Sequence, residues 1–258
     1  MRQLRFRYEM RLDMDQDVWD HHFLIRCRPM ETSRQAIRSF AFGIDPADVV
    51  CEVADGFGNH GYAGSVCAPH RSLAVWSTGT VCAFPRGEEG ALQAMYRFPS
   101  PFTQPGENIR QFLEAACEEY SGAIASREGL EYLMNRLYGR FVYAPGTTTV
   151  RTTAAEALAG GQGVCQDYAH VFISLCRLAG VPARYAAGMM LGEGATHAWA
   201  EVWLDGLWHG YDPTNNRLVD DTYIKLTHGR DFADGTIDRG QFLGFAAQNQ
   251  QILVRVEE

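Results

Sequence analysis

The sequence predicts an α+β fold in which a β-rich N-terminal unit, residues 1–98, precedes a mixed core, residues 99–258. Three observations predict this arrangement. Residues 1–85 hold alternating runs rich in β-branched and aromatic side chains, which favour strands. Helical periodicity begins after a proline-rich stretch at 98–108. An Asp-Gly pair then joins two alternating segments, which is typical of a hairpin, so the core is expected to pack a helix on an antiparallel sheet.

Composition limits the classes of function. The chain has 258 residues, of which 46% are hydrophobic and 21% charged, as in ordinary globular proteins. A net charge of −8 repels phosphate backbones, so no nucleic-acid partner is expected. No apolar run approaches the ~18–20 residues of a membrane helix. The first residues alternate in polarity and lack the apolar segment of a signal peptide, so the expected location is the cytoplasm, with no membrane partner.

The cysteines indicate neither a disulfide framework nor a zinc site. Their number is odd, and no C-x-x-C pair occurs. We therefore expect no metal and no cofactor, and most of the thiols should be small buried hydrophobes. The seven cysteines are Cys27, Cys51, Cys67, Cys82, Cys117, Cys165 and Cys176.

The N-terminal unit is predicted to be an antiparallel sheet layer or a small sandwich. The basic opening MRQLRFR and four later runs are typical of strands, with a turn at DGFGNHG (55–61). The stretch at 98–108 is the best candidate linker, and the alternating end at 250–258 predicts a last strand in the core unit. The four later runs cover residues 21–28, 39–44, 49–54 and 72–84.

Three helices are predicted between the linker and Cys165. Segments 107–120 and 126–139 have helical spacing of apolar residues. TTAAEALAG then indicates a short helix capped by Thr152 or Thr153, with Glu156 placed for a capping box.

Cys165 is predicted to lie at the first turn of a longer helix. An apolar i, i+3, i+4 stripe follows it for over three turns, and Gly180 and Pro182 end the helix. A helix N-terminus carries partial positive charge and free N–H groups, which stabilise a thiolate or an oxyanion. Preceding glycines, including Gly163, would let a substrate backbone approach. A buried structural cysteine is the alternative, and that reading suits Cys176.

The hairpin around Asp205-Gly206 is predicted to supply a base and its partner. If these two residues form the loop, Trp199 faces Asp212 across the strands. His197 and Asp212 then share one face as diagonal neighbours, with Cα atoms roughly 7–8 Å apart. An aspartate in that place fixes the tautomer of a general-base histidine. A slip of one residue would reverse the face.

At these residues the sequence resembles the transglutaminase-like superfamily, a papain-like group that includes transglutaminases, peptide N-glycanases and many bacterial cysteine proteases. The matching segments are GQGVCQDYAHVFISLCRLAGVPARY, THAWAEVWLDGLWHGYDPTNN and HGRDFADGTIDRG. The resemblance covers the core most closely and the preceding β-unit more loosely. It places the catalytic Cys, His and Asp of the family on Cys165, His197 and Asp212.

The resemblance implies an amide-bond enzyme that works through a thioester acyl-enzyme and acts on a peptide or protein substrate. Hydrolysis of peptide or isopeptide bonds is the first expectation. Transfer of the acyl group to an amine is the alternative, and a non-catalytic binding scaffold of the same fold is a third. Ala159 cannot serve as a side-chain oxyanion donor, which leaves Gln162 as a candidate. Trp199 and Tyr185 are candidates to line the cleft.

Overall fold

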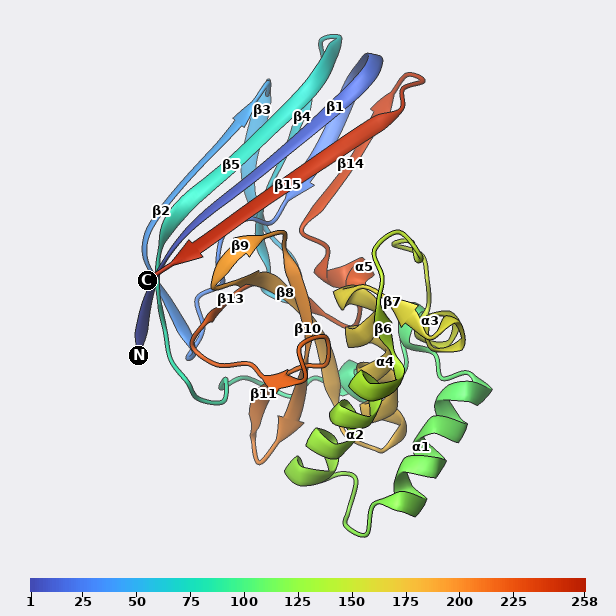
Figure 1. Cartoon of the computed structure of the whole chain (residues 1–258). Helices are drawn as coiled ribbons and strands as arrows, with labels where there is room; N and C mark the ends of the chain where they lie inside the picture. Colours follow the sequence, from blue (N-terminus) through green and yellow to red (C-terminus); the bar gives the residue numbers. More distant parts are fainter.

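The computed structural model describes residues 1–258. A long curved sheet and a second, compact sheet lie side by side, and the helices gather against the second sheet (Figure 1). The two chain termini lie close together at one end of the long sheet (Figure 1). The α+β class predicted from the sequence is confirmed.

The long sheet contains eight strands, all paired antiparallel, with β1 at its centre. The first half of β1, up to Met14, pairs with β5 and β15, and the second half of β1, from Trp19, pairs with β4 and β14. The strands are β1 (Arg2–Ile25), β2 (Gln35–Asp45), β3 (Val49–Ala54), β4 (His60–Val66), β5 (His70–Ala83), β9 (Gly192–Gly194), β14 (Asp238–Leu243) and β15 (Gln248–Glu257).

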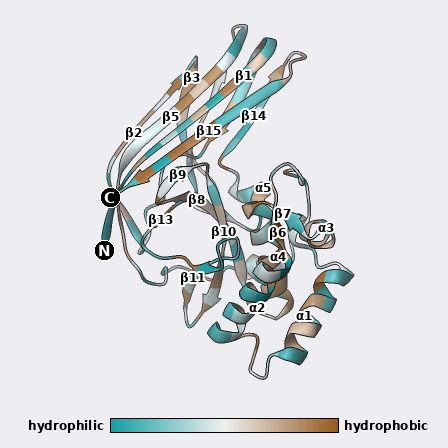
Figure 2. Cartoon of the chain, in the orientation of Figure 1, coloured by the Kyte–Doolittle hydropathy of each residue, from teal (hydrophilic) through white to brown (hydrophobic).

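The alternation seen in the sequence explains how this sheet is covered. Every second residue of the first half of β1 is buried, from Leu4 to Met14, while the residues between them face outward. Figure 2 shows hydrophobic and hydrophilic residues alternating along the long strands. A period of two places all the apolar side chains on one face, and that face forms part of the core.

Three details refine the sequence-based expectation. Of the two predicted forms of the N-terminal unit, a sheet layer or a small sandwich, the strands form the first, because β1 is shared by both halves of one continuous sheet. The last strand, expected within the core unit, pairs with β1 from Arg5 to Met14. Strand β4 was missed because its glycines (Gly61 and Gly64) conceal a strand. A Cβ at Gly64 would lie 2.2 Å from the backbone oxygen of Val49 on β3.

The compact sheet has the order β12-β11-β10-β8-β13 and is also antiparallel. Its hairpin has the predicted register, with Leu204 opposite Leu207 and Ala200 opposite Tyr211. Asp205 and Gly206 both have positive φ, as a two-residue turn requires. The strands are β8 (Ala183–Met190), β10 (His197–Leu204), β11 (Leu207–Asp212), β12 (Arg217–Leu218) and β13 (Tyr223–Gly229), and a separate pair joins β6 (Val142–Tyr143) to β7 (Gln162–Gly163).

The predicted helices are present. Helix α3 is capped by Thr153 and Glu156, which bond each other's backbone N–H groups. Helix α4 is buried on nearly all sides rather than along one face, because the other helices cover the side that does not touch the sheet. The helices are α1 (Glu107–Glu119), α2 (Arg127–Arg140), α3 (Ala154–Gly160), α4 (Cys165–Leu178) and α5 (Phe232–Gly235), with 3₁₀ turns η1 (Ala94–Arg97) and η2 (Pro101–Thr103).

The proline-rich stretch packs against the core instead of hanging free. Ser100 and Thr103 are buried and receive hydrogen bonds from the Arg177 guanidinium of α4, at 3.3 and 2.7 Å. Arg177 also donates to the backbone oxygens of Ala183 and Arg230. One buried cation therefore fixes the linker, the start of β8 and the end of β13 around α4.

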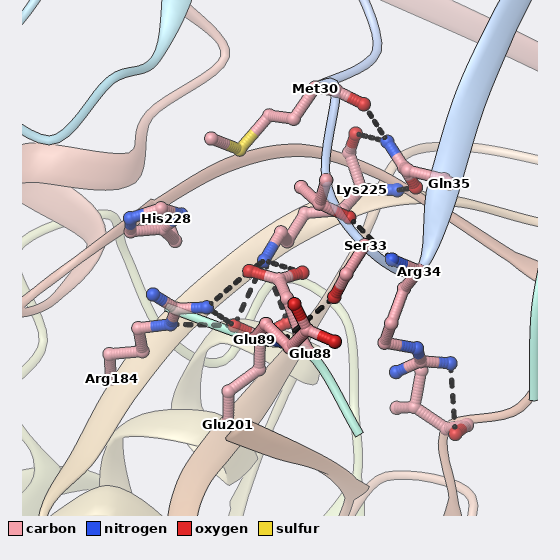
Figure 3. A network of polar contacts seen from close by, with 12 residues as sticks. Met30, Ser33, Arg34, Gln35, Glu88, Glu89, Arg184, Glu201, Lys225 and His228 are labelled. Carbon is pink, nitrogen blue, oxygen red and sulfur yellow. Dashed lines mark hydrogen bonds and ion pairs between the residues drawn. The ribbon is translucent and has the colours of Figure 1, made fainter. Parts of the chain in front are cut away.

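Two buried acids and two buried cations form a network that joins the connection between β5 and η1 to the compact sheet (Figure 3). The Glu88 carboxylate lies 2.7 Å from Arg184 and 2.6 Å from Lys225, and Glu201 lies 2.6 and 3.1 Å from the same two cations. Each side chain is at most 7% exposed. Since the charges balance, the network can lie in the interior, where it connects β8, β10 and β13 to the segment around Glu88.

Candidate active site

Helix α4 begins at Cys165, and Asp167 holds this end of the helix. Its Oδ2 accepts hydrogen bonds from the Val164 N–H at 2.8 Å and from the Thr148 hydroxyl at 2.7 Å. A Cβ at Gly163 would lie 2.5 Å from that oxygen. This glycine was expected to give a substrate backbone access, whereas in the structure it makes room for the capping carboxylate of Asp167. The sulfur is therefore placed at a well-defined first turn.

His197 and Asp212 meet on one face of the hairpin. His197 begins β10 and Asp212 ends β11, and the His197 Nε2 lies 2.7 Å from Asp212 Oδ2. The geometry follows the predicted diagonal pairing. Because Nε2 is directed to the carboxylate, Nδ1 is the ring nitrogen left to exchange a proton with a nucleophile.

Asp212 is fully buried and accepts several hydrogen bonds besides that of His197. Its Oδ2 also accepts from the Tyr223 hydroxyl at 2.8 Å and the Asn215 side chain at 2.7 Å, and its Oδ1 accepts from the Thr214 N–H at 3.1 Å. Burial alone would raise the pKa of Asp212, but His197, Asn215 and Tyr223 hold it below its ordinary value. The carboxylate is therefore ionised and fixed in orientation.

His197 is charged in this setting. Burial lowers its pKa, but hydrogen bonds and charge interactions with Asp212 and Cys165 raise it to about 10. Cys165 is partly exposed and lines the same cleft as this ring. An imidazolium beside a cysteine at a helix N-terminus is the arrangement that nucleophilic cysteines use.

Cys165 and His197 open into one cleft of about 430 Å³. Tyr185 lines it, as expected. Trp199 does not: it is buried against Tyr223, with ring centroids 5.5 Å apart, and so packs behind the histidine. Gln162 lies in another depression, whereas Gln166 lines the cleft. The lining residues also include Val150, Val164, Ala187, Thr196, Ala198, Phe232, Gly235, Thr236, Ile237, Asp238, Arg239, Gln250 and Ile252.

Sequence reasoning missed His170, which positions one wall of the cleft. The side chain is fully buried in α4, and its Nε2 accepts the Phe232 backbone N–H at 3.0 Å. Burial lowers the pKa of His170 to about 3, so the ring is neutral and can accept that bond. Phe232 and Gly235 of α5 line the cleft, so the short helix that His170 contacts forms part of its wall. The i+5 spacing from Cys165 carried no sequence signal.

Replacing Tyr223 by phenylalanine should destabilise the folded protein, because the ionised Asp212 carboxylate loses one hydrogen-bond donor. The Tyr223→Phe variant removes one donor from a buried carboxylate, which costs about 1.5–3 kcal/mol when the donor serves a charged group. The loss in the free energy of unfolding should be present at pH 7. It should shrink as pH falls through the low pKa of Asp212, because a protonated carboxyl group depends less on the donor. Urea denaturation at several pH values measures it.

Tyr211→Phe is the matched control for this substitution. The Tyr211 side chain precedes Asp212 in β11 and faces the other side of the sheet, where it packs on Phe172, and its buried hydroxyl has no hydrogen-bond partner. Removing it should therefore change the free energy of unfolding by well under 1 kcal/mol. Equal losses in the two variants would contradict a specific role for the Tyr223 hydroxyl.

Comparisons with known proteins identify the family. Residues 114–213 match the model of the transglutaminase-like superfamily, and residues 4–82 match that of the bacterial transglutaminase-like N-terminal region. A protein of Mycobacterium tuberculosis, described as uncharacterized, is 33% identical over 240 residues, covering 80% of this chain and 76% of that protein. The chain therefore belongs to the transglutaminase-like superfamily.

Two further likenesses agree with this assignment. An uncharacterized protein of Mycobacterium leprae is 36% identical over 124 residues, 44% of each chain. A crystal structure from Cytophaga hutchinsonii, described as a "putative cysteine protease", shares the fold with a TM-score of 0.80 and 22% identity. It covers 100% of this chain and 92% of that one. The first agrees with the family assignment, and the second shows that the fold is shared.

Neither a membrane helix nor a metal cluster is seen. None of the helices combines the length and hydrophobicity needed to cross a bilayer. No three side chains from His, Cys, Asp and Glu come together in a way that could hold a metal ion.

Proposed function

We propose that the protein is a cysteine-dependent amide-bond hydrolase, with Cys165 as nucleophile, His197 as general base and acid, and Asp212 as the group that orients His197. One observation carries the proposal: a partly exposed thiol at the start of α4 shares a cleft with an imidazole bonded to a buried carboxylate. The substrate class is a peptide or protein, cleaved at a peptide or isopeptide bond.

The proposed reaction has two halves. The Cys165 thiolate adds to the amide carbonyl carbon, and the oxyanion is stabilised by N–H groups at the start of α4, which have no intrahelical acceptor. The C–N bond then breaks, and the leaving amine takes the proton of His197, which leaves a thioester. In the second half His197 takes a proton from water, the resulting hydroxide displaces the thiolate, and the acid is released.

Two alternatives share parts of this scheme. If an amine replaces water, the same thioester leads to acyl transfer. A non-catalytic scaffold would have the same fold and would bind a partner without reacting. The cytoplasmic location stays a prediction. So does the absence of nucleic-acid partners.

The pH dependence of Cys165 alkylation tests the proposal. Iodoacetamide labelling of Cys165, followed by peptide mass spectrometry, should remain fast in the wild type down to pH 6.5. The reason is that His197 keeps its proton up to about pH 10 and stabilises the thiolate. In His197→Ala the rate should fall about tenfold per pH unit below the ordinary thiol pKa of ~8.5.

The three exposed cysteines provide internal controls in the same digest. Cys51, Cys67 and Cys117 are exposed and do not line the cleft, so each should have the same labelling profile in both proteins. A wild-type Cys165 that labels with the profile of these exposed cysteines would contradict an activated nucleophile and would favour the scaffold.

A further inference from the structure

The N-terminal sheet supplies one wall of the cleft around Cys165. Asp238 and Arg239 begin β14, and Gln250 and Ile252 lie on β15, yet all four line the same cavity as Cys165 and His197. Both strands pair with β1 (Figure 1). The cleft therefore lies between the two sheets. The compact sheet and its helices contribute Cys165 and His197, and the long sheet contributes a wall that includes the charged side chains of Asp238 and Arg239.

A second, smaller cavity of about 90 Å³ adjoins this wall. It shares Asp238, Arg239 and Gln250 with the first cavity and is lined farther on by side chains of β1. The side chains farther along it are mostly apolar: Met10, Leu12, Phe23, Ile25, Leu73 and Phe242. Asp238 thus lies where the reactive cleft meets an apolar recess.

Asp238 is the only acid that lines the cleft, and no cation neutralises it. Its side chain accepts one hydrogen bond, from Gln250 Nε2 to Oδ2 at 2.7 Å. The neighbouring Arg239 is exposed and donates to the Ala233 backbone oxygen. Burial raises the pKa of Asp238, while Gln250 opposes the rise only in part.

Three buried acids of the chain (Glu88, Glu201 and Asp212) are better compensated. Glu88 and Glu201 each face two cations, and Asp212 accepts hydrogen bonds from several donors. A carboxylate that is partly desolvated and lacks a counter-charge gains free energy when a cation enters beside it. A position facing the reactive cleft means that a substrate could bring that cation.

We propose that Asp238 is a specificity-determining residue that binds an alkylammonium group of the substrate, with the alkyl stem against the apolar walls. The inference rests on the proposed function, since it concerns what Cys165 acts upon. The ammonium could belong to a basic side chain near the scissile amide or to an amine that accepts the acyl group. Both sources have the same chemistry at Asp238.

Charged thiol reagents test this directly. Cys165 would be modified with 2-aminoethyl methanethiosulfonate, a cation, and with the neutral methyl methanethiosulfonate, at pH 7.5. In both reactions the thiolate sulfur forms a disulfide and methanesulfinate leaves. The transferred groups differ in charge and in size, and the size difference is the same for the wild type and its variants, so it cancels when their rate ratios are compared. Replacing the exposed Cys51, Cys67 and Cys117 by serine isolates the reaction of Cys165.

The ratio of the two rate constants, cationic over neutral, reports on Asp238. It should fall about tenfold in Asp238→Asn, since a nearby carboxylate concentrates a cation in a cleft of reduced dielectric. Asp205→Asn removes the same charge at the tip of the β10–β11 turn and should leave the ratio within about twofold of the wild type. An unchanged ratio in Asp238→Asn would overturn the inference.

The two proposals fail in different ways in this design. Slow reaction with both reagents would contradict an activated Cys165, whereas the ratio would still decide the role of Asp238. Turnover then separates the sources of the ammonium. Loss of preference for lysine-containing over leucine-containing peptides in Asp238→Asn would indicate the acyl donor. Loss of preference for 1,5-diaminopentane over pentylamine would indicate the acceptor, and loss of neither would reject both.

Discussion

Replacing Cys165 by alanine is expected to lower amide hydrolysis by at least about a thousandfold, because removal of a covalent nucleophile removes the acyl-enzyme route itself. The fold should remain intact, since the side chain is small and partly exposed at the end of a helix. Release of new amino termini from a panel of unfolded proteins and glutamine-containing peptides measures the activity. Circular dichroism and urea denaturation check the fold.

Cys176→Ala is the matched control for the loss of a thiol. Cys176 lies in the same helix but is fully buried, and burial raises the pKa of its thiol, so it cannot act as a nucleophile. This variant should lose some stability through packing and keep its turnover. Full activity in Cys165→Ala would remove the proposed mechanism.

The two partner residues should give graded effects. His197→Ala removes the proton carrier and is expected to match Cys165→Ala in the loss of turnover. Asp212→Ala should retain a residual activity, because the imidazole remains and only its orientation and charge stabilisation are lost. Such non-additive losses are typical of residues that act as one unit.

The second large effect concerns stability. Glu201→Gln should lower the free energy of unfolding by about 3–5 kcal/mol, because it leaves Arg184 and Lys225 buried with Glu88 as their single acid. Arg184 also stacks on Trp208, with its guanidinium carbon 4.2 Å from the ring centre, so it cannot easily turn toward solvent. Urea denaturation at pH 7 measures the loss.

An exposed ion pair provides the control. Glu193 lies 2.6 Å from Arg255, and both side chains are more than half exposed. Glu193→Gln should change the free energy of unfolding by no more than about 0.5 kcal/mol, since water already screens both charges. A loss in Glu201→Gln no larger than this would show that the buried network contributes little.

The network also has a consequence for the site. Tyr223 on β13, which bonds Asp212, is two residues from Lys225, and His197 on β10 is four residues from Glu201. The ion network therefore fixes the same strands that carry the proposed base and its partner. A variant that loosens it is expected to slow Cys165 alkylation at pH 6.5 as well as to unfold more readily.

The sequence by itself determined the local features of the site. Periodicity located α4 with Cys165 at its first turn, and the Asp-Gly turn set the register that brings His197 to Asp212. Both are short-range properties: one depends on the 3.6-residue repeat and the other on a two-residue loop, so nearby residues are enough to specify them.

Only the tertiary structure decided what surrounds these groups. It brought β14 and β15 back to β1 across more than 200 residues of chain, and so placed Asp238 in the cleft. In the folded chain Gln162 lies outside the cleft, Trp199 is buried and Glu88 forms an ion pair with Arg184, and none of these was predicted. These contacts depend on which apolar faces pack together and on how buried charges find partners, and no pattern within a short segment encodes such long-range choices.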